Sequence, residues 1–161
     1  MTLNEDSEFF SHTLRRCGTW TGEAARCHLD YEGRFLRRKR LVTDDGMPFL
    51  VNLDKIISVH EGDAFEISGG GLIEIRAASE PLYHITGNRL AALAWHIGNR
   101  HTPCAVAQDH LLIRRDEVLA KMLAGLGAQL TEIYAPFNPE GGAYGFGRTH
   151  SHSHAESDHA G

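Results

Sequence analysis

The order of the apolar patterns between residues 81 and 134 most restricts the folds open to this chain. Two stretches place apolar residues at helical spacing, around residues 90–97 and 118–126. Four strand-like runs surround them, at residues 81–86, 104–107, 110–114 and 128–134. The resulting order is strand, helix, strand, strand, helix, strand. In the ferredoxin-like split βαβ fold, this order packs two helices on one face of a four-stranded sheet.

The ends of the two predicted helices carry local signals. Residues 87–88 are a Gly-Asn cap for the first helix, residues 98–99 weaken its end, and Pro103 stops it. Asp116 is a good N-cap for the second helix, and Gly127 ends it. The predicted apolar stripes are Leu90, Leu93, Ala94 and Ile97 in the first helix, and Val118, Leu119, Met122, Leu123 and Leu126 in the second.

The first half of the chain has a different pattern. From residue 14 to about residue 77, short apolar runs such as residues 49–53 and 56–59 alternate with turn signals at residues 44–46, 61–63 and 68–71. Residues 1–12 are polar, and we expect a loose end there. We therefore predict an α+β protein with a small N-terminal all-β domain (residues 1–77), a ferredoxin-like βαββαβ domain (78–147) and a disordered His-rich tail (148–161).

Composition excludes several functional classes. The net charge of −5 argues against general binding to nucleic acid or anionic lipid. The densest basic run, at residues 34–40, is interpreted as a solvated strand face, with a docking surface for an acidic protein as the alternative. The three cysteines show no Cys-x-x-Cys spacing, and we find neither a signal peptide nor a membrane span. We expect a cytoplasmic protein.

The end of the chain is unusually rich in histidine. His150, His152 and His154 alternate with serines, and His159 follows, in a chain that holds eleven histidines. Three imidazoles at this spacing can reach one ion, so we predict a flexible metal-binding tail. An expression tag is the alternative, but tags usually run their histidines consecutively. The pattern indicates a metal as a class and leaves nickel, zinc and copper open.

Two further histidines flank the end of the first predicted helix. His101 lies beyond the helix and is free to project, so it is the candidate ligand in this region, whereas His96 is expected to have a structural role. Cys104 is either a soft ligand or a core residue. His84 and His110 lie in strand or turn contexts and are interpreted as structural. No catalytic signature accompanies these residues, so we do not expect an enzyme.

Several segments together resemble one known family. The sequence His-Ile-Gly-Asn-Arg-His at residues 96–101, the Asp-Glu-Val-Leu at 116–119 and the Pro-Glu-Gly-Gly-Ala-Tyr at 139–144 are similar to motifs of the UreE-type urease accessory proteins, which are nickel metallochaperones. The resemblance covers nearly the whole chain. Some relatives carry surface histidines at the start of the second helix, where this chain has Arg115 and Glu117.

The resemblance implies a function and partners. It implies a homodimer in which His101 of both subunits binds nickel on the two-fold axis, and in which the tail histidines His150 and His152 complete that site. It also implies that the N-terminal domain contacts partners, and that nickel passes to apo-urease through a GTPase accessory complex. The alternatives are a general store for nickel, zinc or copper, and a protein-interaction module with incidental metal binding.

Overall fold

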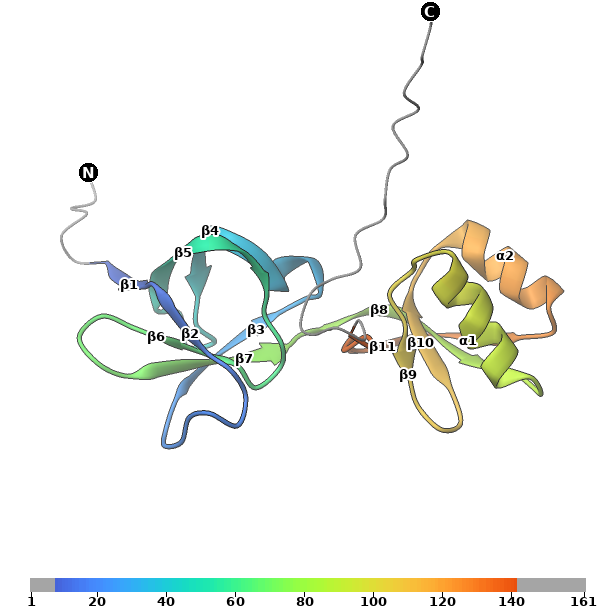
Figure 1. The fold of residues 1–161 in the computed structure, drawn as a ribbon, viewed down its shortest axis with the longest axis horizontal. Coiled ribbons are helices and arrows are strands. Elements are labelled where there is room, and N and C mark those ends of the chain that lie inside the picture. Colours follow the sequence, from blue (N-terminus) through green and yellow to red (C-terminus); the bar gives the residue numbers. More distant parts are fainter. Residues whose placement is uncertain (1–7, 142–161) are drawn as a thin grey trace, which may run out of the picture.

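The computed structural model of this chain describes residues 8–141 as two lobes (Figure 1). Residues 9–77 form the strands of the first lobe, and residues 79–136 form the strands and both α-helices of the second. The fold is therefore α+β. Residues 1–7 and 142–161 lie outside the described part, and with them lie the predicted disordered tail and its candidate ligands His150, His152 and His154.

The first lobe is built from two sheets. One contains β1 (Phe9–Ser11), β5 (Pro48–Ser58) and β4 (Phe35–Val42) in that order. The other contains β2 (Thr13–Arg15), β6 (Ala64–Glu66), β7 (Leu72–Ala77) and β3 (Ala25–Leu29) in that order. A short 3-10 helix, Glu32–Arg34, precedes β4. Each sheet includes one parallel pair of strands, β1 with β5 and β3 with β7, so both sheets are mixed.

Apolar residues from both sheets meet in one core. Alternate positions of β5 (Phe49 and Val51) and of β7 (Ile73 and Ile75) are fully buried, and Phe65 of β6 lies against them. This period of two is what one-sided burial of a sheet requires. Burying a side chain of this size stabilises the fold by roughly 1.5–3 kcal/mol, so this cluster supplies much of the stability of the first lobe.

Three expectations for the first lobe were wrong. Residues 9–11, expected in a loose end, form β1 by parallel pairing with β5. Residues 49–53 and 56–58, expected in two strands, belong to the single strand β5, which pairs with β4 on both sides of an irregularity where the register shifts. Arg34, expected on a solvated face, is only 3% exposed. The rest of the basic run, Arg37 to Arg40, is exposed on β4 as predicted.

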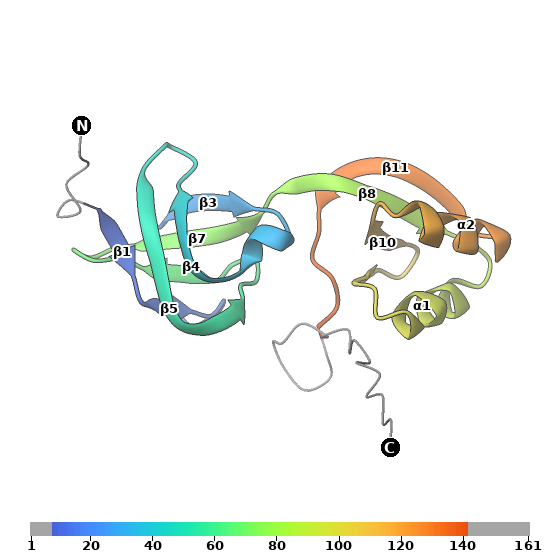
Figure 2. The ribbon, with the colours of Figure 1, turned by 90° about the horizontal axis from the view of Figure 1, so that it is seen from above.

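The second lobe contains a single antiparallel sheet. Its strands β8 (Ser79–Thr86), β9 (Ala105–Val106), β10 (Leu111–Arg114) and β11 (Gln129–Pro136) lie in the order β11-β8-β10-β9. Helix α1 (Leu90–Asn99) follows β8, and helix α2 (Glu117–Gly125) follows β10. Both helices contribute to one apolar cluster with β8 and β10, so they cover the same face of the sheet (Figure 2).

The helix signals were mostly correct. Asp116 caps α2 by accepting a hydrogen bond from the backbone N–H of Leu119 at 2.9 Å. The predicted stripe of α1 packs into the core, but Val118 and Leu126 of the α2 stripe are 69% and 46% exposed, since this nine-residue helix presents only its central turn to the sheet. The predicted cap of α1 was wrong, because Arg89 precedes the helix without a side-chain cap. Neither helix is long and apolar enough to cross a membrane, within the residues described.

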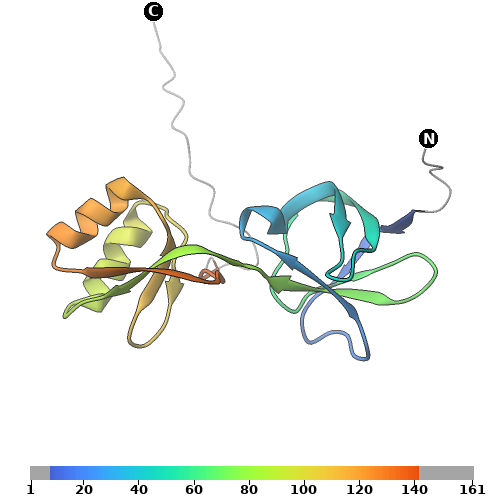
Figure 3. The same ribbon diagram turned by 180° about the vertical axis from the view of Figure 1, so that it is seen from behind.

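Polar contacts join the two lobes where β8 and β11 approach the first lobe (Figure 3). The guanidinium of the buried Arg34 donates to the carbonyl oxygens of Leu29 (2.8 Å) and Phe137. The backbone N–H of Tyr31 donates to Glu80 Oε2 at 2.8 Å, and the rings of Tyr31 and Phe137 meet edge to face at 5.4 Å. These contacts fix the direction in which the chain leaves β11.

A buried carboxylate anchors the loops at one end of the first lobe. Asp63 is 1% exposed. Its Oδ2 accepts hydrogen bonds from Arg16 Nη1 and from the backbone N–H of His60, and its Oδ1 accepts one from the backbone N–H of Cys17, all at 2.8 Å. The carboxylate thus joins the loop after β2 to the turn before β6, with every donor satisfied.

Replacing Asp63 with alanine should lower the free energy of unfolding by roughly 2–4 kcal/mol, because three donors lose their acceptor at once. Urea denaturation of the full chain measures this change. Asp54→Ala, at an exposed position of β5, is the matched control and should shift stability by less than about 0.5 kcal/mol. Equal losses in the two variants would contradict the anchoring role of Asp63.

Candidate metal centre

Helix α1 ends in a closed hydrogen-bonded turn that places His101. The backbone N–H of His101 donates to the Gly98 carbonyl at 3.0 Å, and the N–H of Thr102 donates to the Ile97 carbonyl at 3.4 Å. This pair of bonds is the Schellman motif, which satisfies carbonyls that a helix end leaves unpaired. The helix therefore continues through residues 98–99, which were expected to weaken it, and His101 occupies the position just past the cap.

The backbone of His101 is left-handed. Its φ is 56°, and it is the only non-glycine residue with a positive φ in residues 8–141. Helix α2 ends with the same two bonds, from Gly127 N–H to the Ala124 carbonyl and from Ala128 N–H to the Leu123 carbonyl. There the left-handed position is a glycine, with a φ of 89°. The chain thus uses glycine at one helix end and histidine at the equivalent position of the other.

A histidine at this position carries a conformational cost. A side chain in the left-handed region costs roughly 1–2 kcal/mol relative to the right-handed one, although histidine tolerates the region better than most residues. Backbone strain of this kind gathers at functional sites, where the surrounding structure holds it in place. The His101 side chain is exposed, while its backbone is fixed by the turn. The imidazole is therefore presented to solvent from a rigid base.

The neighbouring aromatic residues distinguish His96 from His101. His96 is half-buried on α1, and its ring meets the ring of Trp95 edge to face at 5.0 Å. Trp95 is itself 64% exposed, which is unusual for so large an apolar side chain. His96 thus packs beside an exposed tryptophan, whereas His101 projects beyond the helix.

Cys104 belongs to the core rather than to a ligand set. It is half-buried and packs against the apolar cluster beneath the helices. Burial, with a smaller contribution from the charge of Glu140, raises the pKa of the Cys104 thiol to about 11. Because a metal binds the thiolate, a thiol that stays protonated at neutral pH is a poor ligand.

The chain returns toward His101 after β11. The backbone N–H of Glu140 donates to the carbonyl oxygen of Cys104 at 2.8 Å, so the last described residues lie beside the loop that follows His101. The predicted ligands His150, His152 and His154 come after this point and lie outside the described residues. The structure therefore brings Glu140 beside Cys104, three residues after His101, and does not describe the histidines that follow.

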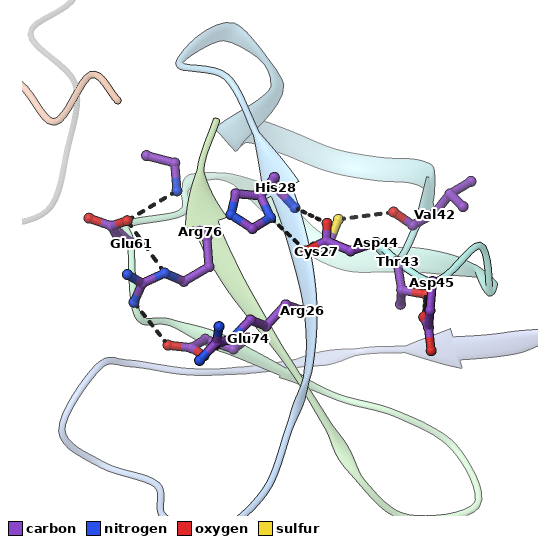
Figure 4. A network of polar contacts seen from close by, with 11 residues as sticks. Arg26, Cys27, His28, Val42, Thr43, Asp44, Asp45, Glu61, Glu74 and Arg76 are labelled. Carbon is purple, nitrogen blue, oxygen red and sulfur yellow. Dashed lines mark hydrogen bonds and ion pairs between the residues drawn. The ribbon is translucent and has the colours of Figure 1, made fainter. Parts of the chain in front are cut away.

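Other titratable groups are paired with one another. His28 Nδ1 lies 2.6 Å from Asp44 Oδ2, and Figure 4 shows the two side chains pointing toward each other across β3. In the same view, Arg76 bridges Glu61 and Glu74. The Cys27 thiol donates to the Val42 carbonyl at 3.3 Å. Throughout residues 8–141, no three His, Cys, Asp or Glu side chains are grouped closely enough to hold a metal ion.

The side chain of Arg115, just before α2, has a structural role. Arg115 Nε donates to the Leu82 carbonyl at 3.2 Å, and its Nη2 donates to the Ile133 carbonyl at 3.1 Å. Its guanidinium also lies over the ring of Tyr134. Arg115 thus ties the loop before α2 to two strands and supplies no metal ligand.

The burial of Cys104 predicts its reactivity. At pH 8, a pKa near 11 keeps the thiolate fraction roughly a hundredfold below that of an ordinary exposed cysteine. A disulfide reagent such as DTNB should therefore modify one thiol of the native chain quickly, that of the exposed Cys17, and Cys27 and Cys104 slowly. Cys17→Ser should remove the fast phase. Loss of the fast phase in Cys104→Ser instead would show that this thiol is accessible and ionised.

Comparison with known proteins matches residues 10–161 to one family. Residues 10–78 match the UreE urease accessory protein N-terminal domain, and residues 73–161 match the UreE urease accessory protein C-terminal domain. The second match includes α1, His101 and the His-rich tail.

Individual relatives agree with these matches. The chain is 53% identical over 141 residues to the urease accessory protein UreE of Ruegeria pomeroyi, an alignment that covers 88% of this chain and 95% of the relative. It is 56% identical over 142 residues to UreE of Cereibacter sphaeroides, covering 88% and 78%, and 53% identical over 137 residues to UreE of Rhodobacter capsulatus, covering 85% and 87%. The chain therefore belongs to the UreE family of urease accessory proteins.

Proposed function

We propose that this protein is a nickel metallochaperone that delivers nickel to apo-urease during assembly of the urease metallocentre. Family membership supports a role in urease maturation. The observation that carries the nickel role is His101, an exposed imidazole held in a strained backbone conformation at the end of α1. An exposed imidazole is a good ligand for nickel, and the helix end itself could be closed without strain by a glycine, as it is at Gly127.

The primary site is shared between two copies of the chain. One imidazole is too few for a tight site, and a two-fold axis through His101 doubles it without a second motif. Trp95, 64% exposed on the same helix, offers the kind of aromatic surface that is enriched at protein interfaces. We infer a homodimer whose interface includes the end of α1, with His101 of both subunits as nickel ligands.

The tail supplies further ligands. Glu140 lies beside Cys104, three residues after His101 in sequence. His150 follows ten residues later, and an extended chain of that length reaches at most roughly 35 Å. His150, His152 and His154 are therefore within reach of His101 by chain length alone, and the tether keeps their effective concentration at the site high.

Such a site suits a carrier rather than a permanent metal centre. Two imidazoles leave coordination positions open, so an acceptor can bind the ion before the carrier has released it. Tail imidazoles detach one at a time, which divides release into small steps. By raw affinity copper binds such nitrogen ligands more tightly than nickel, and zinc also accepts them. Selectivity for nickel must then come from geometry and supply.

The two lobes have different proposed roles. We propose an N-terminal domain of residues 1–77 that contacts partners, a ferredoxin-like domain of residues 78–147 that binds metal and dimerises, and a flexible tail of residues 148–161. The strand order β11-β8-β10-β9 with two helices on one face supports the ferredoxin-like assignment. The exposed basic residues 37–40 of β4 offer a surface for an acidic protein, such as a subunit of the GTPase accessory complex. The protein acts as a cytoplasmic carrier and not as an enzyme.

His101→Ala should remove the tightest nickel site, because both imidazoles of the shared site are lost together. Truncation before residue 149 should lower the number of nickel ions bound per dimer and leave the dimer intact. Equilibrium dialysis of the wild type and both variants measures affinity and stoichiometry, and analytical ultracentrifugation measures the dimer. His96→Ala is the matched control and should keep the tightest site. Unchanged tight binding in His101→Ala would contradict the proposed role of His101.

A nickel-transfer assay with apo-urease distinguishes a protein that delivers nickel from one that only stores it. Nickel-loaded wild type should activate apo-urease in the presence of its GTPase accessory complex, and His101→Ala should not. A storage protein would bind nickel equally well and fail to activate urease faster than free nickel does. An interaction module with incidental metal binding would support activation equally in the wild type and in His101→Ala.

A further inference from the structure

Two histidines that the nickel role leaves unused stack on the sheet of the second lobe. His84 lies in β8 and His110 immediately precedes β10. Their ring centroids are 4.5 Å apart and their planes differ by only 20°. His84 is paired with Leu112, so His110, two residues earlier, occupies the diagonal position on the same face. The two imidazoles are therefore brought together by strand register.

The pair lies on the face of the sheet away from the helices. Ile85 and Leu111, the sequence neighbours of the two histidines, are buried in the cluster beneath α1 and α2. Because successive strand residues point to opposite faces, His84 and His110 point to the other side, where both are half-buried. The β9–β10 hairpin is closed by a bond from the Ala107 N–H to the His110 carbonyl at 3.0 Å, which fixes the backbone of His110 (Figure 1).

A carboxylate sets the tautomer of His110. His110 Nδ1 lies 2.7 Å from Asp109 Oδ1. Asp109 is exposed, and a solvent-exposed aspartate is ionised at neutral pH. An ionised carboxylate can only accept a hydrogen bond, so Nδ1 carries the proton and the lone pair of His110 lies on Nε2. Carboxylate, histidine and metal are commonly arranged in this way.

We propose that His84 and His110 form a second, weaker nickel site, with His110 Nε2 and one ring nitrogen of His84 as its protein ligands and water in the remaining positions. Metal–nitrogen bonds of about 2 Å place two nitrogens on one ion roughly 3–4 Å apart, and the two rings, now stacked with centroids 4.5 Å apart, must rotate so that their in-plane lone pairs converge on the ion. Asp109 acts as a positioning residue.

The geometry defines a site for a late first-row divalent cation, and the choice of nickel rests on the proposed function. The site is separate from His101, which precedes β9, whereas His110 follows the hairpin turn at the other end of that strand. It uses no tail histidine. A weak site on the open face of the sheet would hold an additional ion on each subunit and raise nickel capacity without a change at the shared site.

Nickel is paramagnetic in octahedral sites and broadens nearby NMR signals, so it can be located directly. In 15N-labelled full-length protein, nickel added beyond the tight sites should broaden the amides of Thr86, Ala107 and Leu112. His84→Phe and His110→Phe keep an aromatic stack but remove ligand nitrogens, so each should weaken this broadening at least tenfold in apparent affinity. Asp109→Asn, at an exposed position, should weaken it roughly 10- to 100-fold.

Two controls separate this site from the shared one. His12→Phe removes an exposed imidazole from the first lobe and should change nothing at the pair. His101→Ala should abolish the tightest binding while broadening at Thr86 and Leu112 persists, so failure of either assignment leaves the other testable. Broadening that is unchanged in all three pair variants, or absent from the wild type at millimolar nickel, would overturn the second site. The remaining amide signals report whether each variant is folded.

Discussion

The closed turn at the end of α1 is the constraint on which the proposed metal role depends. Two backbone hydrogen bonds force the residue after the helix cap into the left-handed region, and the chain places a histidine there. The equivalent turn of α2 has a glycine, Gly127, which adopts the left-handed conformation without the steric cost. The strain at His101, on the order of 1 kcal/mol, is sustained because Leu93 and Ile97 anchor α1 in the core. Packing of α1 in the core of the second lobe thus fixes the position of the exposed His101 imidazole.

The junction between the lobes directs the chain after β11 back toward the loop that follows His101. Arg34 is buried among carbonyl oxygens of both lobes, and one of them, from Phe137, lies just after β11. The chain then turns back until Glu140 pairs with Cys104. The last described residues therefore lie beside the loop that follows His101. A long tether attached elsewhere would reach the site with a lower effective concentration.

Local chemistry explains which features the sequence could predict. The order of strands and helices, the cap at Asp116 and the end at Gly127 depend on residues near one another in the chain, and each was found. The choice of His101 came from its place past a helix end and from the family resemblance. The sequence did not predict the left-handed backbone of His101, because residues 98–99 were expected to weaken the helix before that point. The burial of Arg34 depends on a carbonyl 103 residues away, and the His84–His110 stack depends on strand register, so neither had a local signal.

The most direct test replaces His101 with glycine. In metal-free buffer with EDTA, His101→Gly should unfold in urea with a free energy roughly 1 kcal/mol higher than His101→Ala, because glycine relieves the left-handed strain that alanine retains. Equilibrium dialysis should show that both variants have lost the tightest nickel site. This combination, more stable but unable to bind, is what strain held for function predicts. A glycine variant that is less stable than the alanine variant, or that still binds nickel tightly, would contradict the account.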